Sequence, residues 1–104
     1  MPAPQSYLKE LILHAITVHT TTNCQQCRAT KRKLDQAGIE YNTIDVSQQA
    51  QADLADSIRE RAKDLGVAPI MPYVTAYDEH NTLISEWFGF QPAKISELKE
   101  QNDD

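Results

Sequence analysis

Long apolar runs are absent from this chain, in which no stretch approaches the roughly 18 apolar residues of a membrane-spanning helix. The opening Met-Pro-Ala-Pro-Gln also lacks the basic segment that begins a secretory signal. The chain also lacks an excess of positive charge. Its net charge of −5 argues against a nucleic acid as partner, and the short basic cluster at residues 28–33 does not change that. We therefore expect a cytoplasmic protein that acts on another protein, with no membrane and no nucleic acid as partner.

Cysteine is scarce, and both copies fall together. Cys24 and Cys27 are the only two cysteines, in the segment Thr-Asn-Cys-Gln-Gln-Cys-Arg. A chain of 104 residues with 40% hydrophobic composition can fold as a single domain, residues 1–104, without disulfide or metal staples. In the reducing cytoplasm a Cys-x-x-Cys pair is normally catalytic rather than structural. The pair therefore indicates a dithiol redox site.

The spacing of the two cysteines indicates how they divide the chemistry. A short apolar strand precedes them and a helix follows, so Cys24 stands among the unpaired N–H groups of a helix start, which favour thiolate over thiol. Cys27 falls one turn later on the same face, where it can resolve a mixed disulfide that Cys24 has formed. Arg28 and Lys31 follow on the same helix and are predicted to favour the thiolate further, unless the cluster at residues 28–33 is only a solvated basic face.

Two other interpretations of the cysteine pair stay open. A zinc site needs three or four ligands, and besides the cysteines the chain offers only His14, His19 and His80 as nitrogen donors. His19 is the one credible partner, but on a buried strand it is more simply a core or strand-end residue. An inert structural disulfide is the second alternative. The redox interpretation, with no metal ion, is the one we adopt.

Hydrophobic periodicity and turn residues predict an element order of βαβαββα. The glycines at positions 38 and 66 end the first two helices, Ser47 caps the second, and Pro92 opens the last. We divide the domain into an N-terminal extension (1–15), a core (16–100) and a polar tail (101–104). Within the extension residues 1–5 are expected to be disordered and residues 7–12 to form a short helix. The core elements are strands at 16–19, 39–46, 73–77 and 82–87, helices at 24–37 and 47–65, and a closing helix in which Ile95 and Leu98 face inward.

This layout resembles the thioredoxin fold, an α/β fold with a four-stranded mixed sheet flanked by helices. The segment Asn-Cys-Gln-Gln-Cys-Arg-Ala-Thr-Lys is similar to the active-site segment of glutaredoxin-like proteins. The run Trp87-Phe88-Gly89-Phe90-Gln91-Pro92 is similar to the Trp-x-Gly-Phe-x-Pro signature of the NrdH-redoxins, and Gln26 matches a glutamine that those proteins often carry. The resemblance spans about residues 16–100 and identifies the chain as a member of that family.

The resemblance implies an electron carrier. Cys24 and Cys27 would reduce a disulfide in class Ib ribonucleotide reductase, and thioredoxin reductase would restore the dithiol with NADPH, so that the chain itself binds no cofactor. Glutathione would be a poor reductant, because the Thr-Val-Pro segment and Gly-Gly turn of ordinary glutaredoxins are missing. Here Met71 precedes Pro72, and none of the three glycines are adjacent.

The resemblance also implies a surface for partners. We expect a cis peptide bond between Met71 and Pro72 beside the cysteines, where Met71 can pair with an extended substrate strand. Trp87, Phe88 and Phe90, presented by a turn at Gly89, would form an apolar docking surface in which Trp87 is exposed or partly exposed. These aromatic residues also fit a simpler role in the core.

Functions from other classes remain possible at this point. A glutathione-dependent glutaredoxin would share the Cys-x-x-Cys segment. An arsenate-reductase-like transcription regulator would share Cys-x-x-Cys-Arg but would not explain the run from Trp87 to Pro92. A zinc-binding or purely protein-interacting module is the third alternative.

Overall fold

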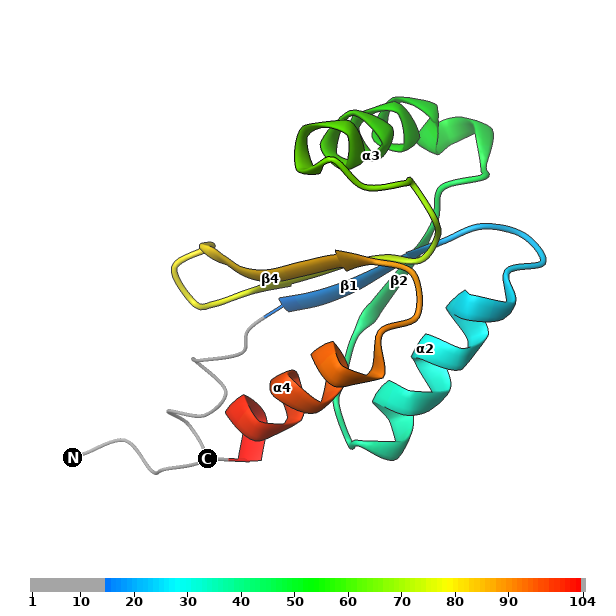
Figure 1. Ribbon diagram of the computed structural model, residues 1–104. Helices are drawn as coiled ribbons and strands as arrows, with labels where there is room; N and C mark the ends of the chain where they lie inside the picture. Colours follow the sequence, from blue (N-terminus) through cyan, green and yellow to red (C-terminus); the bar gives the residue numbers. More distant parts are fainter. Residues whose placement is uncertain (1–14, 104) are drawn as a thin grey trace.

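The computed structural model describes residues 15–103, with a sheet between two layers of helices (Figure 1). The helix α3 covers one face, and α2 and α4 cover the other. The observed order confirms the predicted βαβαββα arrangement. The elements are β1 (Ala15–Thr20), α2 (Gln25–Gln36), β2 (Asn42–Asp45), the 3-10 turn η1 (Gln49–Gln51), α3 (Ala52–Leu65), β3 (Tyr73–Tyr77), β4 (Leu83–Phe88) and α4 (Pro92–Asp103).

The sheet is mixed and has the strand order β2-β1-β3-β4. β1 runs parallel to β2 and antiparallel to β3, and β3 forms an antiparallel hairpin with β4. Because β1 and β3 are central strands with helices on both faces, β3 is buried from Tyr73 to Ala76 although its side chains alternate between the two faces. In the register of β1 and β3, His19 lies opposite Tyr73, so the end of β1 meets the start of β3.

The core consists of two clusters, one on each face of the sheet. Trp87 belongs to the cluster under α2 and α4, and its neighbour Phe88 belongs to the cluster under α3, because successive side chains of a strand point to opposite faces. The first cluster also contains Ile16, Val18, Leu34, Ile39, Val74, Ala76, Ile95 and Leu98, and the second contains Val46, Ala55, Ile58, Ala62 and Tyr73. The predicted inward positions of Ile95 and Leu98 are thus confirmed.

The two helix stops marked by glycine agree with the sequence, whereas one helix start does not. Gly38 and Gly66 have φ angles of 73° and 71°, which confirms them as left-handed stops. Ser47 does not cap α3, which begins at Ala52 after η1. Asp45 accepts the Ser47 N–H and hydroxyl at 2.9 and 2.5 Å, and this Asx-type turn separates the strand from the helix.

The C-terminal end of the chain differs from expectation. α4 continues to Asp103, so the backbone of the predicted polar tail is largely helical. The predicted disorder of residues 1–5 and the predicted helix at 7–12 lie outside the described residues.

A polar network joins α3 to the sheet. Arg61 of α3 donates two hydrogen bonds to the Glu86 carboxylate of β4, at 2.8 and 2.6 Å. The Tyr73 hydroxyl donates a third to the same carboxylate, at 2.8 Å. These bonds lower the pKa of Glu86, and burial together with the Glu86 contact raises the pKa of Tyr73. The network fixes α3 against the two strands next to the active-site end of the sheet.

The lowered pKa of Glu86 predicts a stability that depends on pH. The stabilisation by the ionised carboxylate is present above the unfolded-state pKa, about 4.3, and is lost as the pH falls through the lower folded-state pKa. We expect Glu86→Gln to unfold about 1 to 2 kcal/mol more easily than the wild type near neutral pH, with the difference shrinking towards about pH 3. Urea titrations at a series of pH values measure this.

Glu60→Gln is the matched control, because Glu60 is an exposed glutamate on α3, next to Arg61. It should change the free energy of unfolding by less than about 0.5 kcal/mol. A Glu86→Gln deficit that stays constant down to acid pH would contradict the role given to the ionised carboxylate.

Candidate redox site

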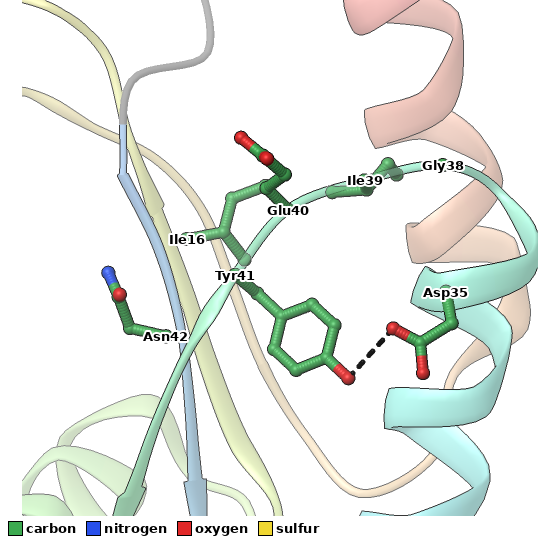
Figure 2. A pocket seen from close by; sticks show the side chains of 7 residues that line it. All are labelled: Ile16, Asp35, Gly38, Ile39, Glu40, Tyr41 and Asn42. Carbon is green, nitrogen blue, oxygen red and sulfur yellow. Dashed lines mark hydrogen bonds between the residues drawn. The ribbon is translucent and has the colours of Figure 1, made fainter.

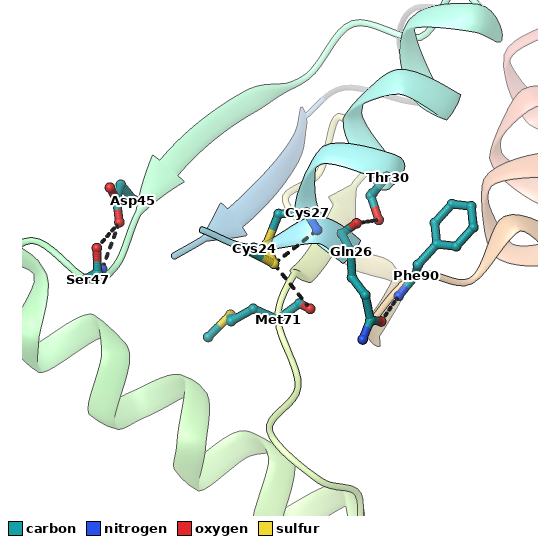
Figure 3. Close-up of a disulfide and its surroundings, with 8 residues drawn as sticks. All are labelled: Cys24, Gln26, Cys27, Thr30, Asp45, Ser47, Met71 and Phe90. Atoms are coloured by element: carbon teal, nitrogen blue, oxygen red, sulfur yellow. Dashed lines mark hydrogen bonds between the residues drawn. A yellow bond between two sulfur atoms is a disulfide. The ribbon is translucent and has the colours of Figure 1, made fainter. Parts of the chain in front are cut away.

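The two cysteines form a disulfide at the start of α2 (Figure 3). Cys24 is the N-cap residue of the helix and Cys27 lies in its first turn, with a Cα–Cα distance of 5.2 Å. Cys24 is half-buried, whereas Cys27 is only 2% exposed. An incoming reactant therefore reaches the Cys24 sulfur first.

The backbone of Cys24 places its sulfur where a cap oxygen normally stands. Cys24 has an extended backbone, and its Sγ accepts the N–H of Cys27 at 3.0 Å. After reduction of the disulfide, this N–H and the positive end of the helix dipole stabilise a thiolate on Cys24. The preceding loop is held by the Val46 N–H, which donates to the Thr20 carbonyl at 2.8 Å.

The peptide bond between Met71 and Pro72 is cis, as predicted. The Met71 carbonyl oxygen lies 3.7 Å from the Cys24 sulfur. The Pro72 carbonyl accepts the Gly89 N–H at 2.8 Å, so the turn after β4 is bound to the same segment. Cys24, the Met71–Pro72 segment and the Gly89 turn therefore meet at one edge of the molecule.

Gln26 extends this cluster, a contact that the sequence analysis missed. Its Oε1 accepts the Phe90 N–H at 2.9 Å, and its own carbonyl accepts the Thr30 hydroxyl at 2.8 Å (Figure 3). Gly89 has a φ angle of 82°, and a Cβ there would lie 3.1 Å from the same Gln26 oxygen. The combination of a glutamine between the cysteines and a glycine in the aromatic run was the available signal.

The expected exposure of Trp87 is wrong. Trp87 and Phe88 are only 3% and 8% exposed because β4 extends through Phe88 and each side chain enters one of the two core clusters. Phe90, beyond the end of the strand, is 37% exposed. Ile70, which was not singled out from the sequence, is 50% exposed and directly precedes Met71. The exposed apolar surface beside the disulfide thus comes from Ile70 and Phe90 rather than Trp87.

The two predicted thiolate-stabilising cations lie on α2. Arg28 is exposed and Lys31 is half-buried. Within residues 15–103 neither side chain forms a hydrogen bond or ion pair with a cysteine sulfur. Their effect on the thiolate, through the general field of the helix, stays a prediction.

The histidines do not gather around the cysteines. His19 is buried, and its Nδ1 donates to the Tyr73 carbonyl at 2.8 Å, while burial lowers its pKa. His80 is exposed in the hairpin turn beside Glu79, and His14 lies outside the described residues. Among the described residues no group of three or more His, Cys, Asp or Glu side chains is placed to hold a metal ion.

A hollow away from the cysteines lies beside the start of β1 and the loop after α2 (Figure 2). Residues around Gly38 and the start of β1 line it, and the Tyr41 hydroxyl donates to Asp35 there at 3.0 Å. Burial and the Asp35 contact raise the pKa of Tyr41. This hollow shares no residue with the cluster around Cys24.

Over the described part of the chain, no helix has the length and apolar character needed to cross a membrane.

Comparison with known sequences finds relatives of this chain among redox proteins. The family model for glutaredoxin matches residues 16–80. The glutaredoxin-like protein NrdH of Salmonella typhimurium is 33% identical over 84 residues, which cover 81% of this chain and 88% of that protein. The corresponding Escherichia coli K12 protein is 31% identical, over 80% of this chain and 86% of its own length.

Solved structures give the same result. NrdH-redoxin from Escherichia coli, described as a glutaredoxin-like protein with a thioredoxin-like activity profile, is 30% identical with a TM-score of 0.59, covering 81% of this chain and 93% of that one. A glutaredoxin from Archaeoglobus fulgidus is 14% identical with a TM-score of 0.61, covering 94% and 97%, and shows the shared fold.

The difference in exposure predicts which cysteine attacks. Reduced Cys27→Ser should accumulate a mixed disulfide through Cys24 when mixed with insulin, because no resolving thiol remains. Cys24→Ser should trap at least about tenfold less, because its one thiol is 98% shielded and lacks the N-cap position. Non-reducing electrophoresis with mass spectrometry measures the adducts.

Stronger trapping by Cys24→Ser would reverse the assignment of the two cysteines. Metal analysis of the reduced wild type belongs beside this experiment, because a stoichiometric zinc ion would support the zinc alternative instead.

Proposed function

The chain belongs to the glutaredoxin family, among its NrdH-type proteins, and we propose that this thiol–disulfide oxidoreductase carries electrons from thioredoxin reductase to a protein disulfide. Class Ib ribonucleotide reductase is the acceptor that the family resemblance implies. NADPH is consumed by the reductase, and the chain itself binds no cofactor. The observation that carries the proposal is the half-buried Cys24 at a helix start, followed by the almost fully buried Cys27.

The chemistry is a two-step exchange. The Cys24 thiolate attacks one sulfur of the partner disulfide, forming a mixed disulfide and releasing a partner thiolate. Cys27 then loses its proton and attacks the Cys24 sulfur, which forms the Cys24–Cys27 disulfide and releases the second partner thiol. Two electrons pass to the partner, and the reductase returns two electrons by the reverse exchange.

Exposed apolar side chains support a protein rather than glutathione as reductant. Leu65, Val67, Ile70 and Phe90 are 42%, 48%, 50% and 37% exposed. The first three line a groove along β4 that also contains Phe88 and Gln91. A protein interface of standard size covers about 800 Å² on each side, so a reductase centred on Cys24 would bury Ile70 and Phe90, which lie beside the disulfide.

The turn beside the disulfide gives glutathione little to hold. Met71 precedes the cis-proline in place of the valine of ordinary glutaredoxins, and the run after Trp87 holds the single glycine Gly89. The thioredoxin-like activity profile of the Escherichia coli relative points the same way.

One comparison of reductants tests the proposal. NADPH oxidation is measured with thioredoxin reductase, and separately with glutathione plus glutathione reductase, using insulin and then class Ib ribonucleotide reductase as acceptors. We expect turnover with thioredoxin reductase at least about tenfold faster than with glutathione. Faster turnover with glutathione would return the chain to the ordinary glutaredoxins, and inactivity of ribonucleotide reductase as acceptor would remove it as the target.

The apolar surface predicts which variants impair the reductase step. Ile70→Ser should raise the KM for thioredoxin reductase about tenfold, since loss of a buried interface side chain typically costs more than 1 kcal/mol at a hot spot. Its reaction with bis(2-hydroxyethyl) disulfide, which needs no docking, should stay unchanged. NADPH oxidation at varied concentrations of the variant measures the KM.

Leu65→Ser is the matched control. Leu65 has a similar exposed fraction, 42% against 50%, but ends α3, away from the start of α2 (Figure 1). Equal effects of the two variants would argue against docking centred on the disulfide. Trp87 is unsuitable for this test, because truncating a buried tryptophan costs about 3 to 5 kcal/mol of stability.

A further inference from the structure

The exposed ring of Phe90 depends on a contact made from between the two cysteines. Phe90 follows β4 and precedes α4, and its backbone N–H donates to Gln26 Oε1 at 2.9 Å. Figure 3 shows the Gln26 side chain extending from the first turn of α2 to the Phe90 backbone. Gln26 itself is exposed, so no packing of a core explains its orientation.

The contact closes a ring of interactions around the disulfide. Gln26 binds Phe90, the neighbouring Gly89 N–H binds the Pro72 carbonyl at 2.8 Å, and the Met71 carbonyl lies 3.7 Å from the Cys24 sulfur. Gly89 leaves no Cβ in the space that the Gln26 oxygen occupies. The turn is thus held from two sides, by the active-site helix and by the cis-proline segment.

We propose that Gln26 is a positioning residue for protein partners: its side-chain carbonyl fixes the Gly89–Phe90 turn against α2 and so holds the exposed Phe90 ring within the interface that forms around Cys24. This deepens the proposed function and rests on it. An interface of about 800 Å² centred on Cys24 covers Gln26 and reaches the residue to which Gln26 bonds. A ring held in place before binding loses less conformational entropy when the partner docks.

Gln25 supplies a matched control for Gln26. It is the other glutamine between the cysteines, it is exposed, and its side chain makes no hydrogen bond within the described part of the chain. Gln26→Leu removes the acceptor at similar volume, whereas Gln25→Leu makes the same substitution without removing a contact. Gln26→Glu keeps an acceptor oxygen and serves as the conservative variant.

The test compares two oxidants of the reduced full-length protein. Insulin is a protein disulfide that requires docking, and bis(2-hydroxyethyl) disulfide is a small neutral one that does not. In both reactions Cys24 and Cys27 become a disulfide and the oxidant becomes two thiols. Alkylation of the remaining thiols at timed intervals, followed by mass spectrometry, gives both rates.

We expect Gln26→Leu to lower the rate with insulin about fivefold relative to the small disulfide, the size of effect that loss of one neutral hydrogen bond allows. Gln25→Leu should leave that ratio unchanged, and Gln26→Glu should retain it. Phe90→Ala should lower the ratio as well, and adding Gln26→Leu to Phe90→Ala should lower it no further. Faster exchange of the Phe90 amide hydrogen in Gln26→Leu, but not in Gln26→Glu, reports the lost contact directly.

The contrary outcomes are distinct. A full fivefold loss from Gln26→Leu in the Phe90→Ala background would show that Gln26 acts on the cysteines rather than through Phe90, and would overturn the proposal. So would equal effects of the two leucine variants, an unchanged ratio in Phe90→Ala, or an unchanged Phe90 amide exchange rate. Failure of the wild type to react with insulin would instead overturn the proposed function, and this inference with it.

Discussion

The antiparallel pairing of β1 with β3 is the constraint from which the site follows. Because His19 lies opposite Tyr73, the loop that leaves β1 and the segment that enters β3 meet at one edge of the sheet. That pairing places the start of α2 beside the Met71–Pro72 bond, with the Met71 carbonyl 3.7 Å from the Cys24 sulfur. Both strands are central in the sheet, and β3 is buried from Tyr73 to Ala76, so the reactive edge is attached to the core of the molecule.

Periodicity and turn residues predicted the element order and the two glycine stops of the helices, because these features depend on local chemistry that the sequence carries. The cis-proline was expected from the resemblance to the thioredoxin fold. The burial of Trp87 was not predictable in the same way. Trp87 lies within the predicted strand at 82–87, but its burial depends on the helices α2 and α4, which cover the face of the sheet to which Trp87 points, while Phe88 points to the opposite face. The predicted start of α3 is wrong because Ser47 can either cap a helix or bond to Asp45 in a turn. In the structure it bonds to Asp45, and the helix begins later.

The candidate site shows the same division between local and long-range information. The Cys-x-x-Cys spacing indicates a dithiol by itself, and the N-cap position of Cys24 follows from the break between strand and helix. The contact from Gln26 to Phe90 joins residues far apart in the sequence. A single sequence shows the glutamine and the glycine that allow this contact, but it does not show the direction of an exposed side chain. The exposure of Ile70 likewise depends on the path of the segment after Gly66, which periodicity does not describe.

The two faces of the sheet support the reactive edge in different ways. On the face under α2 and α4 the support is apolar, because Leu34 of α2 and Ile95 and Leu98 of α4 are almost fully buried in one cluster. On the face under α3 the support is partly polar, because the Glu86 carboxylate accepts hydrogen bonds from Arg61 and Tyr73. Tyr73 directly follows the cis-proline. A hydrogen-bonded carboxylate has directional requirements that apolar packing lacks. The polar network therefore fixes where β3 begins, while the apolar cluster fixes where α2 lies, and the distance between Cys24 and Met71 depends on both.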